Sequence, residues 1–137
     1  MNSPVTIDAS VFISAFTPIE PAHQACKSFM RSIREQSIAI IVPMLVLPEI
    51  SAAISRGQGK PELGKAFAQE LSKLPNTTFI DVNEAVANLA VDLAANNRLR
   101  GSDAVYTTVA LKFGTELITL DKEQLDRLPK AVSVRSP

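Results

Sequence analysis

The sequence has little of the chemistry that supports disulfide frameworks or soft-metal sites. Its 137 residues include one cysteine and one histidine, so no disulfide can form within one chain and no cysteine or histidine cluster can bind a metal. Cys26 lies among apolar residues at helical spacing in the range 22–33, which predicts a buried core residue without a chemical role. The single cysteine fits an intracellular protein.

The chain also lacks a long apolar run and an excess of either charge. Its longest apolar stretch, 37–47, is too short to cross a bilayer and contains Pro43, and no charged segment followed by an apolar one opens the sequence. We therefore expect a cytoplasmic protein without membrane association. The 14 basic residues balance the 14 acidic ones, so net charge gives no evidence for nucleic-acid binding. A hydrophobic content of 46% predicts one domain, 1–137, with a substantial core.

Strand-like apolar runs alternate with helix-like segments along the chain. Five strands are expected, at 5–7, 38–42, 78–82, 116–120 and 132–134. The expected helices are a short one after the first strand, 21–34 with Pro21 at its first position, a hairpin of 45–56 and 61–74, 83–95 capped by Asn83, 102–112 capped by Ser102 and ended by Gly114, and 122–128. This alternation predicts an α/β fold with a central, mostly parallel sheet of about five strands sandwiched between helices.

Four acidic residues follow apolar runs or open predicted helices. Asp8 follows Val-Thr-Ile and Asp121 follows Leu-Ile-Thr-Leu, while Glu49 and Asp103 stand at helix starts. Ligands of open α/β sheets bind beyond the carboxyl ends of the strands, so we expect these acids to converge there. Converging carboxylates repel one another unless a cation compensates. Without cysteine or histidine ligands that cation should be hard, which indicates Mg²⁺ or Mn²⁺.

Each of these acids also has a simpler explanation. Glu49 and Asp103 could be first-turn acids that the helix dipole favours, and Asp121 could cap the helix that follows it. Asp8 is harder to explain in this way, because Ser10 could have served as the cap and the strand before Asp8 is wholly apolar. The simpler explanations would have to hold for all four acids together.

In order and separation, the four acidic segments resemble the motifs of the PIN-domain nucleases, and among them the VapC-type toxins of prokaryotic toxin–antitoxin pairs. The resemblance covers essentially the whole chain and rests on Val5-Thr6-Ile7-Asp8-Ala9-Ser10-Val11, Leu47-Pro48-Glu49-Ile50, the segment from Leu99-Arg100-Gly101-Ser102-Asp103-Ala104-Val105-Tyr106 through Ala110, and Leu117-Ile118-Thr119-Leu120-Asp121. It implies a PIN-like three-layer sandwich. It also implies a Mg²⁺- or Mn²⁺-dependent endoribonuclease that leaves 5′-phosphate and 3′-hydroxyl ends, and the toxin of a type II toxin–antitoxin pair.

The same resemblance implies roles for the individual acids. The implied catalytic set is Asp8, Glu49, Asp103 and Asp121. Asp8 and Asp103 are the expected direct metal ligands, while Asp121 and Glu49 would bind through water, hold a second ion or orient the attacking water.

Two hydroxyl residues close to these acids have an open role. Ser10 and Thr119 would hydrogen-bond the acids or the waters of the metal. Each could equally be an ordinary turn or strand hydroxyl.

Expected partners are RNA, a cognate antitoxin and a second copy of the chain. Arg56, Arg98 and Arg100 are candidates for a substrate rim that contacts phosphates, although a merely solvated surface also explains such residues. Family members commonly form homodimers, and several apolar residues appear in excess of what the sheet can cover, although some could be core: Phe29, Ile33, Leu63, Phe67 and Leu71.

Two further residues, His23 and Tyr106, have side chains that could act at a nuclease site. His23 is remote in sequence from all four acids, so we expect a surface or helix-packing residue rather than a general base. Tyr106 lies about one helical turn after Asp103 and could stack on a base, but core packing beside the site is favoured.

Other classes of protein fit less well. A haloacid-dehalogenase-type phosphatase has a second aspartate where this chain has Ser10, and a receiver domain needs an acidic pair that is missing here. The alternative in another functional class is a catalytically silent PIN-like protein that binds RNA or serves as a scaffold. The presence of all four acids favours the enzyme.

Overall fold

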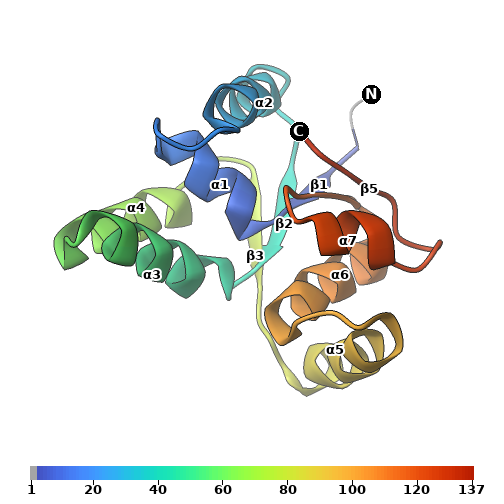
Figure 1. Cartoon of the computed structure of the whole chain (residues 1–137). Coiled ribbons are helices and arrows are strands. Elements are labelled where there is room, and N and C mark those ends of the chain that lie inside the picture. Colours follow the sequence, from blue (N-terminus) through green and yellow to red (C-terminus); the bar gives the residue numbers. More distant parts are fainter. Residues whose placement is uncertain (1–2) are drawn as a thin grey trace.

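The structure is a computed structural model that describes residues 3–137, and a parallel five-stranded sheet lies at its centre (Figure 1). The strands are β1 (Val5–Ile7), β2 (Ile40–Pro43), β3 (Thr77–Ile80), β4 (Glu116–Ile118) and β5 (Val134–Arg135). The helices are α1 (Ala9–Phe16), α2 (His23–Glu35), α3 (Val46–Gln58), α4 (Pro61–Ser72), α5 (Glu84–Asn97), α6 (Gly101–Phe113) and α7 (Lys122–Arg127). The predicted α/β sandwich is confirmed.

Strand order places two of the acidic segments side by side. The order is β3-β2-β1-β4-β5, and each neighbouring pair is parallel. β1 is therefore central, and its register with β4 pairs Ile7 with Ile118. Because parallel strands end at the same edge of a sheet, Asp8 and Asp121 leave that edge next to each other.

Helices cover both faces of the sheet. In Figure 1, α1 to α4 lie on one side and α5 to α7 on the other. Helix α6 contacts β1, β2 and β4, and α5 packs on α6. Ile7, Phe12 and Tyr106 are fully buried in the resulting core, and the central strand β1 is buried on both faces.

Two of the predicted helix starts are wrong. Helix α2 begins at His23 rather than at Pro21, because backbone hydrogen bonds from Glu20 N to Thr17 O and from His23 N to Glu20 O close turns before it. Helix α6 begins at Gly101 with Arg100 as its N-cap rather than Ser102, and the Arg100 carbonyl accepts from Ala104 N at 3.0 Å. This start brings the Arg100 side chain close to the first turn of α6.

Two predicted helix-terminal residues, Asn83 and Gly114, are confirmed. The Asn83 side chain caps α5 by accepting from Val86 N at 3.0 Å, and Gly114 ends α6 with a φ of 64°, a left-handed conformation that glycine adopts without steric cost. Strand β2 starts two residues later than predicted, because Ile38 N still donates to Ile33 O at the end of α2.

The hairpin of α3 and α4 depends on one glycine at the helix contact. A Cβ atom on Gly64 would lie 2.4 Å from the Ser51 carbonyl oxygen, which is too close for any side chain. Glycine at this position therefore allows the two helices to approach. The contact holds α3, which carries Glu49 in its first turn.

The apolar residues that suggested self-association belong to the core. Ile33 and Leu71 are buried, and Phe29, Leu63 and Phe67 are partly buried against the same cluster. Their excess over the sheet is taken up by helix packing, so these residues do not argue for self-association, which stays a prediction. The large apolar side chains that do reach the surface include Val91 of α5, at 65% exposure. Within residues 3–137, no helix has both the length and the apolarity of a membrane span.

Candidate functional site

A hollow of about 430 Å³ lies at the carboxyl edge of the sheet, and all four predicted acids line it. Asp8 and Asp121 come from the ends of the central strands, whereas Glu49 and Asp103 come from the first turns of α3 and α6. Two acids thus follow strands, and two more come from helices on opposite sides of the sheet. The structure brings together four carboxylates that are far apart in sequence.

The predicted accessory residues are placed less uniformly. Ser10, Arg56 and Arg100 line the hollow. Thr119 is fully buried beneath it and contacts Asp8. Arg98 is exposed and ends α5, and it is absent from the lining residues within the described part of the chain. Two of the three proposed rim arginines are therefore at the hollow.

Asp8 is held by two hydroxyl groups. Its Oδ2 accepts from Ser10 Oγ at 2.5 Å and from Thr119 Oγ1 at 3.1 Å. Ser10 Oγ also accepts from Leu120 N at 3.2 Å, and Thr119 Oγ1 accepts from Asp121 N at 3.0 Å. These bonds connect the end of β1 to the loop after β4. Within residues 3–137 no hydrogen bond reaches Asp8 Oδ1, which leaves that oxygen for a cation.

Asp103 and Asp121 are joined by a guanidinium group. Arg100 Nε donates to Asp103 Oδ2 at 3.1 Å, and Arg100 Nη2 donates to Asp121 Oδ2. The other oxygen of Asp121 caps α7 by accepting from Glu123 N at 2.8 Å. Asp121 therefore caps α7, as the sequence allowed, and also lines the hollow.

Gln124 is a member of this cluster that the sequence analysis missed. Its side chain is fully buried, and Nε2 donates to Asp103 Oδ1 at 3.1 Å. Asp121 followed three residues later by glutamine is a helix-start pattern in which the glutamine ordinarily turns back to the cap. Here the amide points inward to Asp103 instead. Only the spacing to Asp121 could have signalled this residue.

Glu49 is positioned by Tyr106. The Tyr106 hydroxyl donates to Glu49 Oε1 at 2.6 Å, and the ring is fully buried. Burial, together with the charge of Glu49, raises the pKa of Tyr106, so the phenol keeps its proton for this bond. Core packing was predicted correctly for Tyr106, and its hydrogen bond to an acid of the hollow is an additional finding.

Burial and mutual repulsion raise the pKa of two of the acids. Burial contributes most to the raised pKa of Glu49, and the charges of Asp8 and Asp103 add to it, while the Tyr106 hydrogen bond opposes it. Burial likewise raises the pKa of Asp103, with Asp8 and Asp121 adding and Arg100 opposing. The hollow therefore holds more negative charge than one guanidinium neutralises.

This excess charge predicts a pH-dependent stability. A carboxyl whose folded-state pKa is raised contributes stability below its unfolded-state pKa, and this contribution is lost as the pH rises through the folded-state pKa. Metal-free protein should therefore gain free energy of unfolding as the pH falls from about 7 toward the ordinary carboxyl pKa of about 4. Urea unfolding across that range should show the gain, and a Glu49→Gln, Asp103→Asn double variant should show a smaller one. Equal gains in both proteins would contradict the assignment.

The donor set agrees in kind with a hard divalent cation. Carboxylate and hydroxyl oxygens line the hollow, and neighbouring carboxylates add to the effect of burial in raising the pKa of Glu49 and Asp103. In the part of the chain that the structure describes, no three acidic, histidine or cysteine side chains are arranged to hold a metal ion. Arg100 instead bridges two of the acids. A metal would have to replace these ion pairs.

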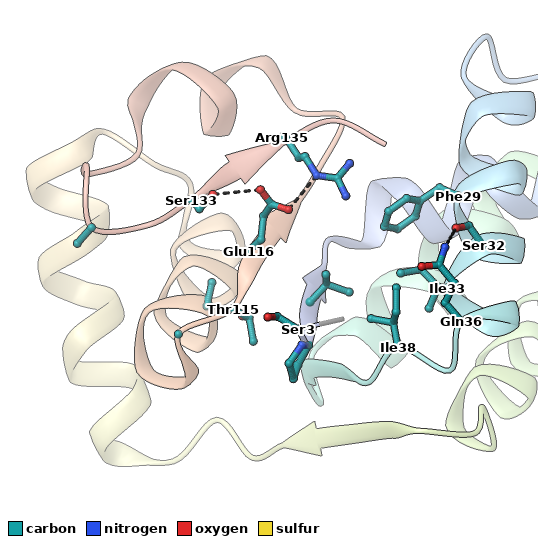
Figure 2. A pocket seen from close by; sticks show the side chains of 15 residues that line it. Ser3, Phe29, Ser32, Ile33, Gln36, Ile38, Thr115, Glu116, Ser133 and Arg135 are labelled. Atoms are coloured by element: carbon teal, nitrogen blue, oxygen red, sulfur yellow. Dashed lines mark hydrogen bonds and ion pairs between the residues drawn. The ribbon is translucent and has the colours of Figure 1, made fainter. Parts of the chain in front are cut away.

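The residues expected to lack catalytic roles lie elsewhere. His23 Nδ1 is 2.8 Å from the Ser14 carbonyl oxygen, a contact between α2 and α1, and Cys26 is fully buried in the core. Figure 2 shows a second hollow, at the edge where the strands begin. There Glu116 is already paired, with Ser133 at 3.1 Å and Arg135 at 2.8 Å.

The protein is an α/β protein with a parallel sheet and four acids at the carboxyl edge of that sheet. The sequence profile of the PIN domain matches residues 5–131. The chain belongs to the PIN domain family. No curated protein sequence matches it at a significant level.

Solved structures share the fold at low sequence identity. A complex of VapBC2 from Rickettsia felis with a promoter DNA fragment contains a chain with 13% identity and a TM-score of 0.72, covering 97% of this chain and 98% of the other. VapC20 from Mycobacterium tuberculosis, described as a Sarcin-Ricin loop cleaving toxin, has 15% identity and a TM-score of 0.76, with coverages of 88% and 92%. FitAcB from Neisseria gonorrhoeae has 16% identity and a TM-score of 0.70, with coverages of 95% and 95%.

Proposed function

We propose that this PIN-domain protein is a Mg²⁺- or Mn²⁺-dependent endoribonuclease and the toxin of a toxin–antitoxin pair. The observation that carries the proposal is the single hollow at which Asp8, Glu49, Asp103 and Asp121 meet. The fold shared with VapC20 supports the choice of RNA as substrate. Burial, together with neighbouring carboxylates, raises the pKa of Glu49 and Asp103, so keeping these two acids at the hollow costs stability, and a metal site gives a physical reason for that cost.

In this proposal the acids divide into ligands and supporting groups. Asp8, Asp103 and Asp121 would hold the cation, and Asp8 Oδ1 is open to it. When bound, the cation supplies positive charge that activates water and neutralises the scissile phosphate. Glu49, with its proton-donating partner Tyr106 at 2.6 Å, is positioned to orient water at the hollow. Ser10, Thr119 and Gln124 hold the carboxylates in place.

Specificity has to come from outside the acids, because carboxylates offer no means of reading bases. We propose that arginines at the rim contact the phosphate backbone of single-stranded or looped RNA, with little activity on duplex. Arg56 lies on α3 at the hollow, and Arg98 ends α5 beside the first turn of α6.

Charge reversal at Arg56 and Arg98 should weaken RNA binding. Each lost phosphate contact should reduce the slope of log affinity against log salt by about 0.7 for a single strand. Metal affinity should barely change, because neither side chain touches the acids. A matched reversal of Arg31 and Arg34, which line a separate hollow against α2, should leave the slope unchanged. RNA binding titrations at several salt concentrations measure the slopes, and equal slopes in both double variants would exclude this rim.

Two protein partners belong to the proposal. The neighbours include chains from VapBC and toxin–antitoxin complexes, which supports a small antitoxin as the cognate partner of this chain. Self-association as a homodimer now rests on the family resemblance alone, because the apolar residues first used to argue for it are buried or partly buried against the core. Light scattering at micromolar concentration should give twice the monomer mass of 14.8 kDa. A monomer would exclude the dimer.

The decisive experiment separates an enzyme from a scaffold that lacks activity. Purified protein is incubated with a panel of single-stranded, looped and duplex RNAs with Mg²⁺, with Mn²⁺ or with chelator, and melting temperature is recorded in parallel. An enzyme should cut looped RNA only with metal and should melt higher with metal. Metal stabilisation without cleavage of any RNA would favour the binding or scaffold alternative.

A further inference from the structure

We propose that the Arg100 guanidinium neutralises the acidic hollow in the metal-free protein and is displaced from the acids when a divalent cation binds. Arg100 would then set the metal affinity of the site by competition. The inference rests on the proposed function, because it assumes that the hollow binds a divalent cation.

The contacts of Arg100 place it where a cation is needed. Its guanidinium bridges Asp103 and Asp121 from the mouth of the hollow, through Nε to one carboxylate and Nη2 to the other. The two carboxylate side chains are only 9% and 15% exposed, whereas the arginine side chain is 69% exposed. The two aspartate side chains are therefore nearly buried, whereas the arginine side chain extends to them from the solvent-exposed surface.

The same oxygen atoms cannot serve both cations equally. Arg100 engages Oδ2 of both aspartates, and the remaining oxygens of these residues accept from Gln124 Nε2 and from backbone amides of α7. A metal that takes Asp103 and Asp121 as ligands therefore competes with the guanidinium for Oδ2. By linkage, whatever Arg100 contributes to the metal-free state lowers the apparent metal affinity by the same factor.

The arginine is suited to leave. It precedes the first residue of α6 as the N-cap in an extended conformation, so its side chain can move without disturbing the helix. Ion pairs of an exposed arginine are individually weak, whereas a divalent cation interacts more strongly with the same carboxylates. After displacement the guanidinium remains at the edge of the hollow, where a substrate phosphate would lie.

The first test compares metal affinity in three proteins. Metal-stripped wild type, Arg100→Gln and Arg98→Gln are titrated with Mn²⁺ by calorimetry. Arg98→Gln is the control: it removes the same positive charge two residues away, from a side chain that forms no ion pair with the acids of the hollow. Arg100→Gln should bind Mn²⁺ about fivefold to tenfold more tightly than wild type, and Arg98→Gln less than about twofold more tightly. Equal affinities of the two variants would overturn the competition.

The second test observes the arginine directly. In ¹⁵N-labelled metal-free wild type, the Arg100 Nε–H signal, assigned by its absence from Arg100→Gln, should be shifted and slow to exchange because it donates to Asp103. Addition of Mg²⁺ should move it toward the position of exposed arginines. If Mg²⁺ shifts the amides of Asp8 and Asp103 but leaves this signal in place, the metal site stands and displacement is wrong. If Mg²⁺ shifts none of them, both the metal-dependent function and the displacement fail.

Discussion

Replacement of Asp8 or Asp103 by asparagine should reduce Mg²⁺-dependent RNA cleavage by about a hundredfold or more, because each change removes a charge that the cation needs. Asp8 Oδ1 accepts no hydrogen bond within residues 3–137, and Asp103 is the more buried of the two acids that Arg100 bridges. Cleavage rates are measured on a looped RNA in preparations shown to be free of host nuclease. A variant that cuts at the wild-type rate would remove its residue from the mechanism.

The fold of both variants should survive. Asparagine keeps the size of aspartate and relieves repulsion with the remaining acids, so the metal-free melting temperature should hold or rise. The relief should be clearer for Asp103→Asn, since burial and two neighbouring acids raise the pKa of that carboxyl. Asp92, in the exposed middle of α5, offers a control: Asp92→Asn should change neither cleavage nor melting. Melting curves without metal distinguish lost chemistry from lost structure.

Replacement of Gln124 by glutamate should be the most destabilising single change at the site. The amide nitrogen lies 3.1 Å from Asp103 Oδ1 in a fully buried position. A carboxylate there would face the Asp103 carboxylate on the side away from Arg100, which pairs with Oδ2. We expect the free energy of unfolding at neutral pH to fall by about 3 kcal/mol. The new carboxyl would have a raised pKa, so the loss should shrink as the pH falls.

Gln124→Met provides the matched comparison. Methionine has a similar length and no charge, and it removes an oxygen that has no hydrogen-bond partner within residues 3–137. Its stability should stay within about 1 kcal/mol of wild type, because the loss of the hydrogen bonds from Nε2 to Asp103 and Thr119 is offset in part by removal of one unpaired buried acceptor. Urea unfolding of both variants at two pH values measures the difference. Equal losses for glutamate and methionine would show that packing, rather than charge, governs this position.

Much of the fold was predictable because local patterns agree with the tertiary arrangement. Strand 5–7 is buried on both faces because helices cover both faces of the sheet. Asn83 and Gly114 marked helix termini correctly because capping depends on neighbouring backbone groups. Pro21 and Ser102 misled because residues able to start a helix were overruled by turns and packing around them.

The sequence by itself determined the class of fold and the four acids, since both follow from periodicity and from residues placed at the ends of strands and the starts of helices. Only the tertiary structure decided which side chains pair with those acids through ion pairs and hydrogen bonds. Arg100 contacts Asp121 across 21 residues, and Tyr106 contacts Glu49 across 57. Gln124 turns inward to Asp103 although its local pattern predicts a capping residue. Such contacts depend on strand order and on the packing of α3, α6 and α7 around the sheet, which no local spacing encodes.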